Sequence, residues 1–121
     1  MRTAGRENAV IDENLEKALC FIRDKAGELA EAKANRVYLE QFRKSKKAIL
    51  FSQSTAKTDG KRENEAYAHP EYLEVLDGLR TAVEIEEKLK FQMIAAQLKI
   101  EVWRSKNANN RFEQRQYGVK G

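Results

Sequence analysis

The sequence has few of the residues that form disulfides, bind metals or break helices: one proline, one cysteine, one histidine and six glycines among 121 residues. The single cysteine, Cys20, excludes a disulfide framework within the chain and favours a reducing compartment. One histidine and one cysteine do not make a zinc ligand set, and neither a glycine-rich phosphate loop nor a nucleophile motif with a base is present. We therefore expect no catalytic residue, no metal site and no cofactor, and predict that the protein is not an enzyme.

Long apolar runs are missing as well. No run approaches the roughly 20 residues that cross a bilayer, and the polar start MRTAGRENAVIDEN lacks the apolar middle of a signal peptide. These absences predict a cytoplasmic protein without a membrane partner.

Charged and helix-forming residues are abundant, with 35% charged and 41% hydrophobic residues. The apolar fraction exceeds that of a disordered chain, whereas the charge leaves only a narrow apolar stripe to bury. On each side of Pro70, more than forty residues favour helix. We predict one all-α domain over residues 1–121: an oligomerising, antiparallel coiled-coil hairpin of two long helices, with three helices as the alternative.

The first helix is predicted over about residues 12–55. It opens with a seam in which the spacing alternates between four and three, formed by Leu15, Leu19, Ile22, Ala26 and Leu29. Continuing this register would bring Lys33 and Arg36 into the core. We therefore expect a stutter over about residues 27–35, after which the apolar face shifts to Ala34, Val37 or Tyr38, Phe42 and Ile49. The Ser-, Thr-, Asp- and Gly-containing run that follows predicts a mobile loop over about residues 56–69.

The second helix is predicted over about residues 70–108, with Pro70 in its first turn, and is followed by a frayed basic tail over 109–121. Its seam alternates four and three without a slip: Val75, Leu79, Ala82, Glu86, Leu89, Met93, Ala96, Ile100 and Trp103. Further apolar residues widen this surface beyond what one helix covers: Tyr72, Leu76, Val83, Ile85, Phe91, Ile94 and Leu98. We predict a homo-oligomer whose interface contains Val75, Leu79, Leu89, Met93, Ile100 and Trp103. The number of copies, and whether the helices pair within one chain or swap between chains, stay open.

Two basic blocks stand out against the net charge of +4. Residues 36–62 contain eight basic and two acidic residues, and residues 102–121 contain five and one. Such clusters neutralise phosphates and release counterions, and nearby aromatic rings can stack on unpaired bases. The candidate nucleic-acid contacts are Arg36, Arg43, Lys44, Lys46, Lys47, Arg104, Lys106, Arg111 and Arg115, with Tyr38, Phe42, Phe112 and Tyr117 as candidate stacking residues.

The first basic block has a structural alternative. In a hairpin, residues near 44 lie opposite residues near 84, so the block would pair with Glu84, Glu86 and Glu87. Glu86 occupies a seam position, and because a buried unpaired carboxylate is costly, we expect it to lie at the solvent edge or to pair with a cation, for which Arg43 and Lys44 are the candidates. The second block contains Glu113 as its one acidic residue, so the structural alternative is weaker there, and contact with a nucleic acid or another anion stays open.

The order of segments carries a family resemblance over about residues 34–111. A basic helix ending in RKSKKAIL is followed by the polar stretch TAKTDGKRENE, a restart at AHPEYLEVLDGL and an amphipathic helix closing on IEVWRSKNANNR. In this order the chain resembles small phage-encoded recombination mediators of the UvsY type. The resemblance implies an oligomer in the host cytoplasm that binds single-stranded DNA through Arg43, Lys44, Lys46 and Lys47. It also implies partners, namely a strand-exchange recombinase and single-strand-binding protein.

Two functions are therefore considered. The first is a phage-type single-stranded DNA-binding or recombination-mediator accessory protein that acts as an oligomer through its basic blocks. The alternative is a coiled-coil interaction or assembly module, such as a phage structural or accessory protein or a host-directed inhibitor, that does not bind nucleic acid. The choice between DNA and RNA is left open.

Overall fold

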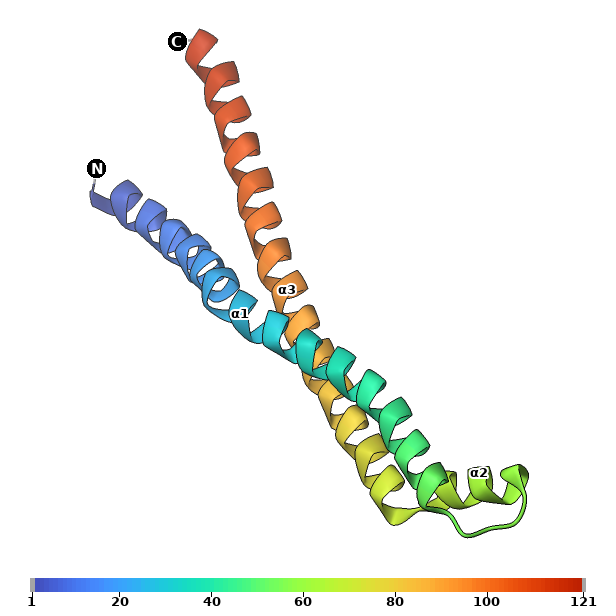
Figure 1. Cartoon of the computed structure of the whole chain (residues 1–121). Helices are drawn as coiled ribbons and strands as arrows, with labels where there is room; N and C mark the ends of the chain where they lie inside the picture. The colour runs from blue at the N-terminus through green and yellow to red at the C-terminus, as the bar shows by residue number, and fades with distance from the viewer. Residues whose placement is uncertain (1, 121) are drawn as a thin grey trace. The chain divides into compact units, whose positions relative to one another are not determined.

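The fold is known from a computed structural model, which describes residues 2–120 and the side chains of residues 13–116. Three helices follow one another: α1 (Arg2–Gln53), α2 (Asp59–Ala68) and α3 (Pro70–Lys120) (Figure 1). Residues 2–120 contain no strand, so the predicted all-α class is confirmed. The hairpin over the whole chain and its oligomerisation stay predictions. In the described part of the chain, no helix is long and apolar enough to span a membrane.

The chain forms two compact units. The central unit contains Glu28–Leu89, and the terminal unit combines Met1–Gly27 with Lys90–Gly121. Both long helices run through the two units, while α2 belongs to the central unit alone.

The predicted mobile loop over 56–69 is wrong for most of its length, because residues 59–68 form α2. Thr58 caps this helix: its hydroxyl accepts a hydrogen bond from the backbone N–H of Lys61 at 3.3 Å. Asp59 lies in the first turn, where a negative charge is favourable. The Thr, Asp and Gly that indicate a loop by composition therefore start a helix here, and the irregular connection is confined to residues 54–58.

The start of the second long helix at Pro70 is confirmed. His69, the residue between α2 and α3, accepts a hydrogen bond at its Nδ1 from the backbone N–H of Glu71, at 3.0 Å. The predicted frayed tail is wrong for residues 109–120, which continue α3. Residues 104–117 contain neither proline nor glycine and include several good helix formers, so nothing in this stretch ends the helix.

The buried side of α1 differs from the predicted one. Buried and half-buried residues recur at spacings of three and four with no stutter, at Leu15, Ala18, Ile22, Lys25, Leu29, Ala32, Arg36, Leu39, Arg43, Lys46 and Leu50. Ala18 and Lys25 take the places predicted for Leu19 and Ala26, which are exposed. Of the predicted later core residues, Phe42 is half-buried, whereas Ala34, Val37, Tyr38 and Ile49 are exposed. The predicted stutter keeps basic residues out of the seam of α1. Basic residues can nevertheless occupy seam positions, because their long aliphatic stems can be buried while their charged groups reach solvent at the edge of the helix interface.

The predicted seam of α3 is confirmed as its buried side. All nine predicted positions are buried or half-buried, and the pattern extends at its ends to Tyr72 and Asn107. The six residues assigned to an oligomer interface belong to this seam, and they are half-buried within a single chain: Val75, Leu79, Leu89, Met93, Ile100 and Trp103. They are therefore less available to a second copy than the exposed apolar residues of α3.

Two contacts set the register between α1 and α3 in the central unit. Arg36 bonds to Glu86, and Leu50 packs with Tyr72. Arg36 and Leu50 are fourteen residues apart, as are Tyr72 and Glu86, so the two segments run in opposite directions with a constant register over two heptads. Ala66 of α2 completes the cluster of Leu50 and Tyr72, and this contact holds α2 against both long helices.

Candidate functional site

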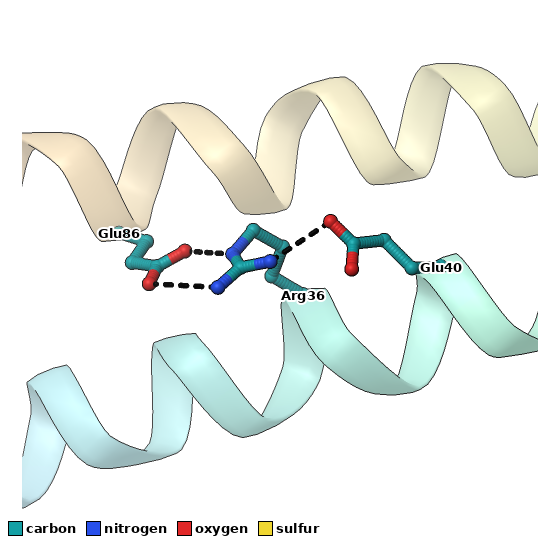
Figure 2. A network of polar contacts seen from close by, with 3 residues as sticks. All are labelled: Arg36, Glu40 and Glu86. Carbon is teal, nitrogen blue, oxygen red and sulfur yellow. Dashed lines mark hydrogen bonds and ion pairs between the residues drawn. The ribbon is translucent and has the colours of Figure 1, made fainter.

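Glu86 of α3 is the most buried charged residue among those described, with 1% of its surface exposed. Figure 2 shows the guanidinium of Arg36 between Glu86 and Glu40. Arg36 donates from Nε and Nη2 to the two carboxylate oxygens of Glu86, and from Nη1 to Glu40 at 2.8 Å. These bonds, first to Glu86 and then to Glu40, raise the pKa of Arg36 above its already high value. The buried carboxylate of Glu86 is thus bound by a bidentate guanidinium donor.

The predicted partners of Glu86, Arg43 and Lys44, are therefore wrong. In the observed register Arg36 lies at the level of Glu86, and Arg43 lies one heptad further along α1. Glu84, another predicted partner of the first block, forms an ion pair with Lys88 one turn along its own helix, at 3.4 Å.

Lys46 and Lys47 hold the elements of the central unit together. The Nζ of Lys46 lies 2.9 Å from a carboxylate oxygen of Glu71, and this contact lowers the pKa of Glu71. The Nζ of Lys47 lies 2.9 Å from a carboxylate oxygen of Glu63, donates to the hydroxyl of Tyr67 and lies 4.2 Å from the centre of that ring. The hydrogen bond to Tyr67, followed by that to Glu63, raises the pKa of Lys47. Both lysines therefore have structural partners.

Arg43 and Lys44 are the remaining candidate nucleic-acid contacts in the first block. Neither makes a hydrogen bond or ion pair with any residue in the described part of the chain; Arg43 is half-buried and Lys44 is exposed. Lys44 lines a groove of about 430 Å³ together with Lys47, Ala48, Phe51, Asp59, Gly60 and Glu63. Because two carboxylates face the two lysines there, the groove does not concentrate positive charge.

The second basic block is more accessible. Arg104, Lys106, Arg111 and Arg115 are all exposed. Arg104 lies 3.3 Å from Glu101 in a pair whose side chains are about two-thirds exposed, so the pair is weak. The other three make no hydrogen bond or ion pair with the part of the chain that the structure describes. At about 100° per residue, Arg104, Arg111 and Arg115 fall within one narrow arc of α3, and Lys106 points to the opposite side.

The aromatic candidates fall into different environments. Tyr38 stacks on Phe42, with ring centres 5.9 Å apart, while Phe112 is exposed beside the arginines of the second block. The side chain of Tyr117 lies outside the described residues. Trp103 is a half-buried seam residue whose indole N–H is buried without a hydrogen-bond acceptor among the described residues.

The structure also identifies residues that sequence reasoning missed. Glu63, Tyr67 and Glu71 are the partners of Lys46 and Lys47, and they are missed because their positions depend on α2 and on the turn into α3. The position of Arg36 in the seam of α1 could have been predicted from the sequence. Alternating steps of four and three residues back from Leu50 lead to Arg36. Among residues 13–116, no group of three or more His, Cys, Asp or Glu side chains is placed to hold a metal ion.

Comparison with known proteins gives no relative. No protein-family model, no curated protein and no solved structure matches the chain. The functional assignment therefore depends on the two basic blocks and on the apolar surface of α3.

Proposed function

We propose that this protein is a non-enzymatic accessory protein of the recombination-mediator type, which binds single-stranded nucleic acid as an oligomer. The strand lies along Arg104, Arg111 and Arg115 of α3. The observation that carries the proposal is the accessibility of this arginine row, in contrast to the first block, where three of the five candidate contacts pair with Glu86, Glu71 and Glu63.

The arginine row suits a flexible polyanion. Guanidinium groups bind phosphate oxygens through two parallel hydrogen bonds, and the row offers three such groups along about 16 Å of helix. A few phosphate contacts give weak binding by one copy, so linked copies gain affinity by engaging one strand together.

The first block contributes less in this proposal. Lys46 and Lys47, which the family resemblance assigns to DNA contact, already bind Glu71 and Glu63, so Arg43 and Lys44 act as the secondary contacts. The partners, a recombinase and single-strand-binding protein, and the location in the host cytoplasm follow from the resemblance alone.

The test is a fluorescence-anisotropy titration of labelled single strands over a series of lengths and salt concentrations. A variant with Arg104, Arg111 and Arg115 each replaced by glutamine should bind much more weakly, and its slope of log affinity against log salt should fall by about 2, at roughly 0.7 per lost contact. The matched control replaces the exposed residues Lys33, Lys57 and Arg80 by glutamine, which removes the same charge elsewhere. No binding by the natural sequence at low salt, or equal losses in both variants, would refute the proposal.

The alternative is an assembly module without nucleic-acid affinity, as a phage structural or accessory protein or a host-directed inhibitor. It is favoured by a specific observation: Arg36, Lys46 and Lys47, three of the five candidate contacts in the first block, form ion pairs within the chain. A monodisperse oligomer that binds no strand of any length would support it.

A further inference from the structure

A second heptad pattern runs along α3 on the side away from the seam. It consists of Phe91, Ala95, Leu98, Val102, Ser105, Asn109 and Phe112, spaced alternately by four and three, and we name it the outer stripe. From Ala95 to Asn109, each member lies two positions beyond a seam residue, which places it about 200° around the helix. All seven residues are exposed, and their four large apolar side chains keep between 53% and 66% of their surface.

The outer stripe is large enough to matter energetically. Four large apolar side chains and the neighbouring Ile94, each exposing on the order of 100 Å², leave roughly 400–500 Å² of apolar surface in water. An apolar patch of this size is comparable to the largest one on a typical monomer, and such patches are often functional. Doubled by an identical partner and extended by flanking polar residues, the area reaches about the 1,200 Å² at which stable interfaces begin.

The residue types of the outer stripe match a parallel, two-stranded coiled coil. In heptad notation, Ala95, Val102 and Asn109 occupy a positions, and Phe91, Leu98, Ser105 and Phe112 occupy d positions, so Val102 and Leu98 form a β-branched and leucine pair at a and d. A β-branched residue at a with leucine at d favours two parallel strands. A single asparagine at an a position fixes the register and the number of strands.

The flanking charges favour the same arrangement. Glu101 is at a g position and Lys106 at the e position of the next heptad, and these are the positions that meet between the helices of a parallel pair. Lys106 has no ion pair with any described residue, and the contact of Glu101 with Arg104 is an exposed pair at 3.3 Å. An antiparallel pair would instead bring e positions against e positions, which removes the complementarity.

We propose that a second copy of this chain covers the outer stripe, with the two α3 helices parallel, in register and related by a two-fold axis. Glu101 of each copy then pairs with Lys106 of the other. This deepens the proposed function, because it names the surface through which copies associate. The arginine row lies on another face of α3, so the two proposals can fail separately.

The first test is the mass of the full chain in solution, measured by light scattering after size exclusion. The natural sequence should have twice the mass of the 14.0 kDa chain at tens of micromolar, and Leu98→Lys should have the mass of one chain. Because Leu98 is exposed within the chain, the helix content by circular dichroism should not change. The control Val37→Lys alters an exposed apolar residue of α1 and should remain dimeric. A monomeric natural protein, or an oligomer whose mass Leu98→Lys leaves unchanged, would overturn the proposal.

The second test addresses orientation. Glu101→Lys and Lys106→Glu should each weaken dimerisation about fivefold, because each places two like-charged pairs at the interface. The double exchange should restore the dimer to within about twofold. Additive losses in the double variant would exclude the parallel arrangement.

Strand binding separates this inference from the proposed function. If the natural protein is monomeric yet binds a strand through the arginines, the proposed dimer is refuted and the proposed strand-binding role of the arginine row is supported. If the protein is a dimer that Leu98→Lys dissociates, but binds no strand, the dimer stands and the nucleic-acid function is wrong.

Discussion

Replacing Leu50 by alanine should destabilise the protein far more than the same change at its neighbour Ile49. Leu50 is 5% exposed and packs with Ala66 and Tyr72, whereas Ile49 is 46% exposed. Leucine-to-alanine changes at buried sites cost 2–5 kcal/mol, and a small cluster that can partly collapse belongs in the lower half, at about 3 kcal/mol. With an unfolding entropy of about 2.1 cal/mol/K per residue, this cost lowers the melting midpoint by roughly 12 °C. Ile49→Ala should stay within about 1 kcal/mol, or roughly 4 °C.

The assay is thermal unfolding followed by circular dichroism at 222 nm, with all variants at one protein concentration because association would shift the midpoint. The pair of variants also tests the register of α1, since the sequence alone predicts Ile49 as the core residue. A midpoint that falls as far for Ile49→Ala as for Leu50→Ala would refute the seam described above.

Two further predictions concern the ion pairs of the central unit. Arg36→Met removes the hydrogen bonds that the guanidinium donates to the buried carboxylate of Glu86, so its melting midpoint should fall much further than that of Arg43→Met, and equal midpoints would contradict the pairing. Lys46 holds the pKa of Glu71 below its usual 4.5, so this pair stabilises the fold above pH 4.5 and stops doing so as the pH falls through the lowered pKa. In urea denaturation, the stability difference between the natural sequence and Lys46→Met should therefore shrink from about pH 6 to about pH 3. A difference that is constant with pH would show that Lys46 acts through packing alone.

The second basic block illustrates how much of the candidate site can be read from the sequence. Arg111 and Arg115 have few acidic neighbours in the chain, and both are exposed as expected. The first block could not be interpreted in this way. Whether Lys47 binds a ligand or the chain itself depends on Glu63 and Tyr67, which approach it because α2 folds back beside α1. Composition indicates a loop at that segment and gives no sign of the contact.

The helical class, the start of α3 at Pro70 and the buried side of α3 follow from local sequence patterns, because an uninterrupted alternation of apolar residues fixes which face of a helix leaves water. The buried side of α1 depends instead on contacts with the rest of the fold. Basic residues occupy seam positions of α1, whereas hydropathy alone predicts that they lie on the solvent-exposed surface. Arg36 is tolerated because the opposing helix presents Glu86 at the same level, and that pairing depends on the register between two segments some fifty residues apart, which no local pattern encodes.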